Sequence, residues 1–208
     1  MFNYYGSKSK ISRYYPIPMY NIVIEPFAGA AWYSVLHFDK KVILNDLNPT
    51  VYGIWKWLIT EDCESVIKDN ADFWLGQDIS GLNLPNAYKD LIGFCINRGS
   101  SQPCNIVQKW SCQSKKNPEW ASSVHYRLMH IASMIPKIKH WEIYNLDYSE
   151  LSNIHATWFI DPPYCVGGHA YPQHTVNYEN LAVYSRSRCG QVIVCEMTVL
   201  HGFRLSHL

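Results

Sequence analysis

Five short runs rich in β-branched residues constrain the fold of this chain more than any other feature. Four of them end in an acidic residue or next to one, and helical stretches separate them. Short apolar strands that alternate with helices predict an α/β fold with a parallel, doubly wound sheet. Ligands of such sheets bind at the carboxyl ends of the strands, where the acids lie. The runs are Asn21–Glu25, Lys41–Asp46, Trp141–Asp147, Thr157–Asp161 and Gln191–Cys195.

Almost a hundred residues of different character separate the second run from the third. We interpret 61–139 as an insertion into a core that is formed by 1–60 and 140–208. Its turn-rich stretch, Ala87–Ser123, is expected to contain a recognition element. Apolar residues then recur at helical spacing from Ala121 to Ile135, which predicts one core-facing helix that Pro136 ends.

The basic residues of the chain are unevenly distributed. Between Arg98 and Lys139 there are seven basic residues and one acid, so this stretch carries +6 and the rest of the chain, whose total charge is +1, carries −5. A basic lobe on a slightly acidic body suits a bound polyanion, although a solvated surface explains the charge equally well.

The cysteines and the hydropathy pattern narrow the class of protein. Seven cysteines are scattered without a CxxC pair, which favours a reducing cytoplasm over a disulfide framework and gives no zinc site. We expect no bound metal. No apolar run reaches membrane-spanning length, and the polar, aromatic N-terminus does not resemble a signal peptide.

The turn after the first run has the form of a nucleotide-cofactor loop. Glu25-Pro26-Phe27-Ala28-Gly29 would let the backbone approach a ligand at Gly29, and Asp46 follows seventeen residues later. An acid about 20 residues after such a glycine holds ribose hydroxyls in Rossmann-type sites. A single glycine suits a cofactor without phosphates, such as S-adenosylmethionine, better than a dinucleotide.

The tetrapeptide Asp161-Pro162-Pro163-Tyr164 follows an apolar strand and is the strongest chemical signal. Two prolines end the strand and stiffen the loop, so the Asp161 carboxylate and the Pro162 carbonyl can point the same way. These two acceptors match the two hydrogens of an exocyclic amine, and Tyr164 offers a ring on which a flipped base can stack. The structural alternative is a rigid turn with a helix-capping aspartate.

With these motifs in this order, the chain resembles the Dam-like, D12-class DNA adenine-N6 methyltransferases, as a short phage-type member. Tyr4-Tyr5-Gly6-Ser7-Lys8 is similar to the family's N-terminal element, and Asn145-Leu146-Asp147-Tyr148 to its adenine-bordering segment. The resemblance implies a Rossmann-like methyltransferase with an inserted target-recognition lobe. It also implies catalysis by residues 161–164. Cofactor-binding residues would be Tyr4, Lys8, Glu25, Phe27, Gly29, Asp46, Asp147 and Asp161.

The resemblance assigns further roles, with Lys8 near the carboxylate end of S-adenosyl-L-methionine, Asp46 on the ribose and Asp147 on the adenine amino group. Double-stranded DNA is the expected partner of a monomer or weak dimer in a bacterial or phage-infected cytoplasm. The residues expected to contact DNA are Arg98, Lys109, Lys115 and Lys116, and those able to read base edges are Asn97, Arg98, Ser100, Ser101 and Gln102.

Several alternatives stay open. Enzymes with related loops methylate N4 of cytosine or N2 of guanine in RNA. Ala30 and Ala31 place methyl groups in the cofactor turn, where we expect them to crowd the methionine end. The tail from Met197 can be read as the product of a frameshift. A catalytically impaired remnant that binds DNA or cofactor is therefore a third hypothesis.

Overall fold

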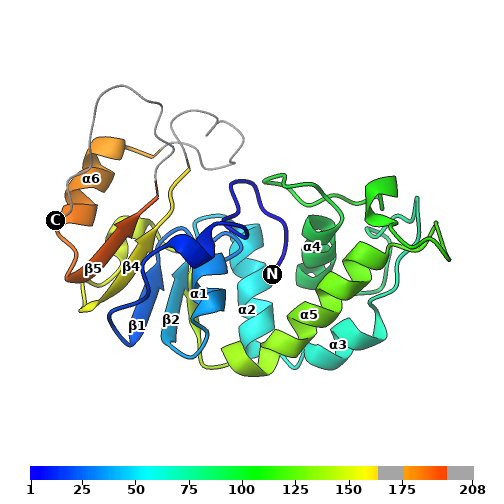
Figure 1. The fold of residues 1–208 in the computed structure, drawn as a ribbon, viewed down its shortest axis with the longest axis horizontal. Coiled ribbons are helices and arrows are strands. Elements are labelled where there is room, and N and C mark those ends of the chain that lie inside the picture. The colour runs from blue at the N-terminus through cyan, green and yellow to red at the C-terminus, as the bar shows by residue number, and fades with distance from the viewer. Residues whose placement is uncertain (164–175, 196–208) are drawn as a thin grey trace.

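A five-stranded, all-parallel sheet in the order β3-β2-β1-β4-β5 forms the centre of the computed structural model, which describes residues 1–163 and 176–195 (Figure 1). All five predicted runs form strands, with bounds that differ by one to three residues. The α/β prediction is therefore confirmed. The strands are β1 (Ile22–Glu25), β2 (Lys41–Asn45), β3 (Glu142–Tyr144), β4 (Ala156–Ile160) and β5 (Gly190–Val194).

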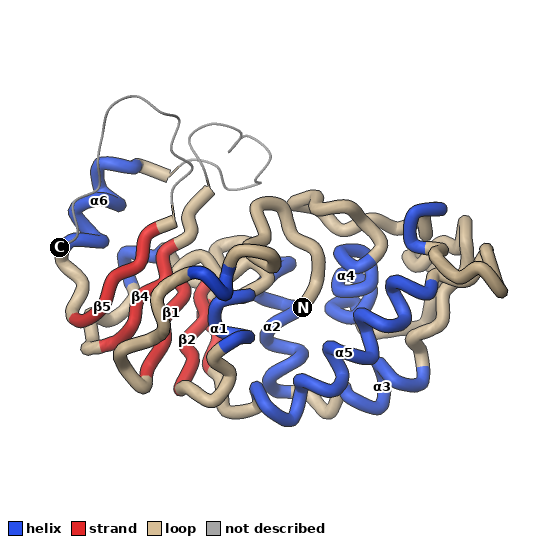
Figure 2. The backbone as a smooth tube through the Cα atoms, in the orientation of Figure 1, coloured by secondary structure: helices blue, strands red, loops and turns tan. Residues whose placement is uncertain are grey.

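Helices connect most of the strands, and region 61–139 combines helices with long loops (Figure 2). The local sequence explains where α2 begins: the Asn48 side chain accepts a hydrogen bond from the Thr50 N–H at 3.0 Å, and Pro49 occupies the first helical position. The α-helices are α1 (Trp32–Leu36), α2 (Pro49–Thr60), α3 (Glu64–Asp69), α4 (Asn86–Cys95), α5 (Ser122–Ile138) and α6 (Tyr178–Arg186). Short 3-10 turns are η1 (Ser12–Tyr14), η2 (Lys109–Ser111) and η3 (Tyr148–Glu150).

Apolar residues cover both faces of the sheet, which explains why the strands are apolar runs rather than alternating ones. Val23 and Phe159 face a large cluster that includes α1, α2, α4 and α5. Ile24 and Trp158 face a smaller cluster with α6 and Leu151. Figure 1 shows α6 on the β5 side of the molecule and the other long helices on the β2 side.

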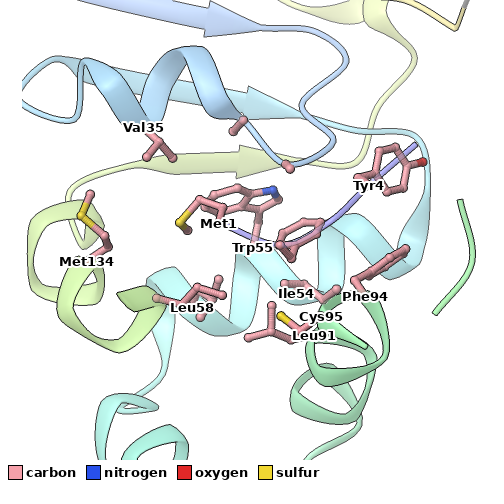
Figure 3. Packing of buried hydrophobic residues seen from close by; sticks show 14 of the residues in the cluster. Met1, Tyr4, Val35, Ile54, Trp55, Leu58, Leu91, Phe94, Cys95 and Met134 are labelled. Carbon is pink, nitrogen blue, oxygen red and sulfur yellow. The ribbon is translucent and has the colours of Figure 1, made fainter. Parts of the chain in front are cut away.

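Region 61–139 continues the large cluster instead of forming a core of its own. Ile67 of α3, Leu91 of α4 and Ile131 of α5 are buried in the same cluster as Val42 and Leu44 of β2. Trp55 of α2 lies at the junction, packed near Met1 and Phe94 (Figure 3). The single helix expected here is one of three, because α3 and α4 also contribute apolar faces.

The prediction that Pro136 ends α5 is wrong, since the helix runs on to Ile138. Proline removes the one backbone donor that would bond the Ala132 carbonyl, but only two helical residues follow it, so a bend there displaces little of the helix. Lys139, just beyond the helix, donates from Nζ to the Leu58 and Glu61 carbonyls and fastens this end of α5 to α2.

The strand order places a ligand site between β1 and β4. The chain proceeds outward from β1 to β2 and β3, then returns to pair β4 with the other side of β1. The crevice at such a switch point is the usual ligand site of open α/β sheets. Here it lies just beyond Glu25 and Ile160, the last residues of the two strands.

Candidate functional site

A pocket opens at the β1/β4 switch point, and segments far apart in sequence form its wall. The segments are 4–8, 25–33, 45–48 and 146–148, together with Phe159, Asp161, Pro163 and Val176. The structure thus brings together all eight residues that the sequence suggested for the cofactor. Their roles stay predictions.

The turn after β1 has a backbone that favours glycine at position 29. Gly29 has φ +47°, and a Cβ there would lie 3.0 Å from Cδ1 of the Tyr4 ring. Trp55 Nε1 donates to the Gly29 carbonyl at 2.8 Å and fixes the turn to α2. The Tyr4 ring therefore packs directly on the glycine of the loop.

Ala31 also has a left-handed backbone, with φ +47°, although it carries a Cβ. This conformation costs an L-residue about 1 kcal/mol. Ala30 and Ala31 are both buried in the pocket wall. The expected crowding of a ligand by their methyl groups stays a prediction.

Asp46 connects the loops after β1 and β2. Its Oδ2 accepts from the Gly29 N–H at 2.8 Å, and its Oδ1 accepts from the Asn48 N–H at 2.9 Å. Burial raises the pKa of this carboxyl to about 6, while the two backbone hydrogen bonds oppose the increase. Each oxygen keeps a second lone pair, so the carboxylate can still accept hydrogen bonds from a ligand hydroxyl.

Asn45 is a structural residue of the site that the sequence reasoning missed. From the buried end of β2, its Nδ2 donates to the Pro26 carbonyl at 3.0 Å and to the Leu146 carbonyl at 3.1 Å, while its Oδ1 accepts from the Leu146 N–H at 3.0 Å. One amide therefore joins the loops that follow β1, β2 and β3. The only signal in the sequence is an amide at the end of an apolar strand.

Lys8 and Asp161 form an ion pair across 153 positions of sequence. Lys8 Nζ lies 2.7 Å from both Asp161 carboxylate oxygens and 3.0 Å from the Gly6 carbonyl oxygen. The side chains are 7% and 19% exposed, respectively. We expected Lys8 near the carboxylate end of the cofactor, but its ammonium contacts the candidate catalytic carboxylate.

Glu25 is a second carboxyl residue beside the Lys8–Asp161 pair, and it is buried. Its Oε1 accepts from the Ser34 N–H at 2.8 Å. Burial raises the pKa of Glu25 to about 8; the charge of Asp161 adds to this, whereas the Ser34 hydrogen bond and Lys8 oppose it. At neutral pH Glu25 therefore carries a proton.

The proline pair ends β4 as the sequence predicted. The strand stops at Ile160, Pro162 is buried, and the Tyr178 hydroxyl donates to the Pro163 carbonyl. The Phe159 ring stacks on Tyr33 with centroids 4.3 Å apart, which packs the base of the loop. Tyr164, the remaining residue of the motif, and the tail from Met197 lie outside the described residues.

Asp147 lines the pocket but also caps a helix turn. Its Oδ1 accepts from the Ser149 N–H at 2.9 Å, and Glu150 Oε2 accepts from the Asp147 N–H at 2.9 Å, which completes a capping box for η3. The exposed carboxylate keeps acceptor capacity toward the pocket.

The seven basic residues between Arg98 and Lys139 divide into two groups. The structural group consists of Arg127, which donates to the Cys95 carbonyl, Lys137, whose ammonium lies over the Phe38 ring, and Lys139. The other group is exposed and outside the pocket: Arg98, Lys109, Lys115 and Lys116. These four are the residues predicted to contact DNA.

Asn97 does not present its side chain to read a base. It is buried, its Oδ1 accepts from the N–H groups of Gly99 and Ser100, and its Nδ2 donates to the Gln102 carbonyl. Ser101 is also buried. For these two residues the base-reading expectation is wrong, because loop geometry uses the Asn97 amide and burial removes Ser101 from the surface.

The described residues contain no group of three or more His, Cys, Asp or Glu side chains placed to hold a metal ion. Within the same residues, no helix is long and apolar enough to cross a membrane.

Comparison with known proteins gives one informative match. No curated protein matches the chain. The matching family model covers the N-terminal element, the loops after β1 and β2, and α2 and α3, so it includes Lys8, Gly29 and Asp46. Residues 4–78 match the model of the D12 class N6 adenine-specific DNA methyltransferases.

Proposed function

We propose that the protein transfers a methyl group from S-adenosylmethionine to the N6 amino group of adenine in DNA, with the target base turned out of the duplex. The observation that carries the proposal is the position of Asp161. It lies at the β1/β4 switch point, in the wall of the pocket that the family-matched loops form. A carboxylate placed there can hold an amine beside a ligand in that pocket.

The pocket wall suits a cofactor without phosphates. Lys8 is the sole basic residue among the described wall residues, and its ammonium is paired with Asp161. A pyrophosphate would lack cations, whereas the Asp46 carboxylate suits ribose hydroxyls. Trp32 Nε1, a buried donor in a wall residue, has no hydrogen-bond partner in the described part of the chain.

Each wall residue would contribute to holding this cofactor. Asp46 would accept from the ribose, Asp147 from the adenine amino group, and the rings of Tyr4 and Phe27 would contact the apolar parts. When bound, the cofactor supplies an electrophilic methyl group on a sulfonium.

Asp161 would bind and orient the acceptor amine. Its carboxylate and the Pro162 carbonyl would accept the two amine hydrogens, which directs the nitrogen lone pair away from them and toward the methyl group. The amine loses its proton during or after transfer, so Asp161 need not act as a base first. Because Lys8 Nζ contacts both carboxylate oxygens, the amine must share Asp161 with Lys8 or displace it.

The test is transfer of tritium from labelled S-adenosylmethionine to unmethylated DNA, followed by digestion to nucleosides. We expect label in N6-methyl-2′-deoxyadenosine. Label in N4-methylcytosine, or no label with folded protein, would contradict the proposal.

Two variants connect this activity to the site. Asp161→Ala should lower the rate by about 100-fold or more, as for loss of a group that orients charge at a reacting centre. Asp62→Ala is the matched control, since Asp62 is an exposed aspartate in the turn between α2 and α3. Equal rates for the two variants would remove Asp161 from the mechanism.

Calorimetric titration with S-adenosylmethionine separates an enzyme from a remnant. We expect binding with turnover. Binding without turnover would indicate that the fold is retained and catalysis lost.

A further inference from the structure

A second hollow adjoins the pocket at the β1/β4 switch point. It is an open groove of about 610 Å³ between residues 3–15 and the loop at Arg98 and Gly99. Residues 4–8 line both hollows. Lys8 is in both walls, and its ammonium contacts Asp161. A molecule in the groove would therefore lie one residue from the candidate catalytic carboxylate.

The two walls of the groove are fixed to each other by hydrogen bonds. Asn3 Nδ2 donates to the Asn97 carbonyl at 2.8 Å, and the Tyr5 N–H donates to the Ser100 carbonyl at 3.3 Å. The loop is held from inside by the buried Asn97 side chain. The groove is thus built into the fold, and it does not depend on one flexible segment.

The groove has the chemistry of a nucleic-acid site. Its described lining residues include Arg98 and three tyrosines, and no acid; Lys8 also lines it, but its ammonium is paired with Asp161. Backbone-tracking nucleic-acid grooves combine basic residues with aromatic rings in this way. Its volume lies within the range of sites for small ligands, which includes a nucleotide.

Arg98 is oriented by an aromatic ring. Its guanidinium carbon lies 5.6 Å from the centroid of the ring of Trp110, which is part of η2. Arginine binds phosphate through a planar fork of donors, and stacking on a ring reduces the freedom lost on binding. Arg98 is exposed, so its outer donors are accessible from the groove.

We propose that this groove binds the sugar–phosphate backbone of the DNA strand at the target nucleotide, with Arg98 binding a phosphate that flanks the target adenosine. This inference rests on the proposed function and deepens it. The cofactor and the DNA strand would then lie in adjoining hollows that share residues 4–8.

The probe is a fluorescein-labelled single strand of about nine thymidines with one central deoxyadenosine, which presents the base without the cost of flipping. Its affinity is measured by fluorescence anisotropy with S-adenosylhomocysteine present. Arg98→Gln should weaken binding about tenfold. It should also reduce the slope of log affinity against log salt by about 0.7, as for one lost phosphate contact to a single strand.

Arg186→Gln is the matched control, because it removes the same charge from an exposed position in the last turn of α6. Trp110→Leu is the second variant, since it keeps the Arg98 cation and removes the ring beneath it. We expect it to weaken binding about threefold with the salt slope unchanged.

A modified probe locates the phosphate. A neutral methylphosphonate at the two linkages that flank the deoxyadenosine should weaken binding to the wild type and have little further effect on Arg98→Gln. The same modification near the end of the strand should weaken both proteins equally. Equal penalties for both proteins at the central linkages would overturn the assignment of Arg98.

The inference about the groove and the proposed function can be refuted separately. If Arg98→Gln binds the probe as Arg186→Gln does while the wild type methylates adenine, the groove inference is wrong and the function stands. If the wild type binds the probe through Arg98 and transfers no methyl group, the function is wrong and the groove is a DNA site.

Discussion

Replacing Glu25 by glutamine should change how the stability of the fold depends on pH. Burial raises the pKa of Glu25 to about 8 in the folded protein, compared with an ordinary value of 4.5. Between these two values the folded state holds a proton that the unfolded chain has released. The free energy of unfolding therefore falls as pH rises through this window, and it becomes independent of Glu25 above pH 8.

The slope gives the expected magnitude. One proton bound only by the folded state lowers stability by about 1.4 kcal/mol per pH unit, so the Glu25 contribution falls by about 3 kcal/mol between pH 5 and pH 7. Glutamine stays neutral and keeps an acceptor for the Ser34 N–H. The difference in stability between Glu25→Gln and the wild type should therefore shift by about 3 kcal/mol in favour of the variant.

Urea denaturation at several pH values, followed by far-ultraviolet circular dichroism, measures this difference. The raised pKa of Asp46, about 6, contributes the same slope to both proteins and cancels. If the difference between variant and wild type is the same at pH 5 and pH 7, Glu25 is already ionised in the folded protein, and the argument from its burial fails.

Three further substitutions test the pocket. Gly29→Ala should cost about 1–2 kcal/mol in urea denaturation, because φ is +47° and the new Cβ meets the Tyr4 ring at 3.0 Å; an unchanged midpoint would contradict this geometry. Ala31→Gly should stabilise the fold by up to about 1 kcal/mol, because it relieves an alanine in a left-handed conformation; destabilisation would show that the φ of Ala31 is not strained. Calorimetry should show tighter cofactor binding by this variant if the Ala31 methyl group crowds the ligand. Asp46→Asn should cost about 1–3 kcal/mol, since one of the backbone N–H groups of Gly29 and Asn48 would face an amide NH₂; loss of cofactor affinity without loss of stability would mean that the two hydrogen bonds contribute nothing.

Local signals in the sequence predict the sheet and the positions of its loops. Runs such as Lys41–Asp46 are apolar because both faces of a parallel strand are buried, and this pattern is visible without tertiary information. The spacing from Gly29 to Asp46 predicts a ribose-binding acid beside the glycine turn, and the structure brings the two residues together through a 2.8 Å hydrogen bond that the spacing alone did not predict. These features depend on neighbours that are close in sequence or on a recurring loop geometry.

Contacts across long separations could not be predicted in the same way. Asn45 bonds the Leu146 backbone across 101 positions, and Lys8 pairs with Asp161 across 153. No local pattern specifies either partner. The role of Asn97 was misassigned for a related reason: an amide in a polar loop can cap the loop or face a ligand, and only burial distinguishes the two.

The charges around Asp161 predict a proton release when the cofactor binds. Lys8 contacts Asp161 directly, so its ammonium balances the Asp161 carboxylate. Lys8 lowers the pKa of Glu25 too little to offset the effect of burial, and Glu25 therefore stays protonated. A sulfonium bound in this pocket adds a positive charge, which favours ionisation of Glu25. Titration calorimetry at pH 7 in two buffers of different ionisation enthalpy should therefore show release of up to one proton with S-adenosylmethionine. S-adenosylhomocysteine, which lacks the sulfonium charge, should release less, and Glu25→Gln should abolish the difference. Equal release for the two ligands would mean that Glu25 does not sense the charge at the reacting centre.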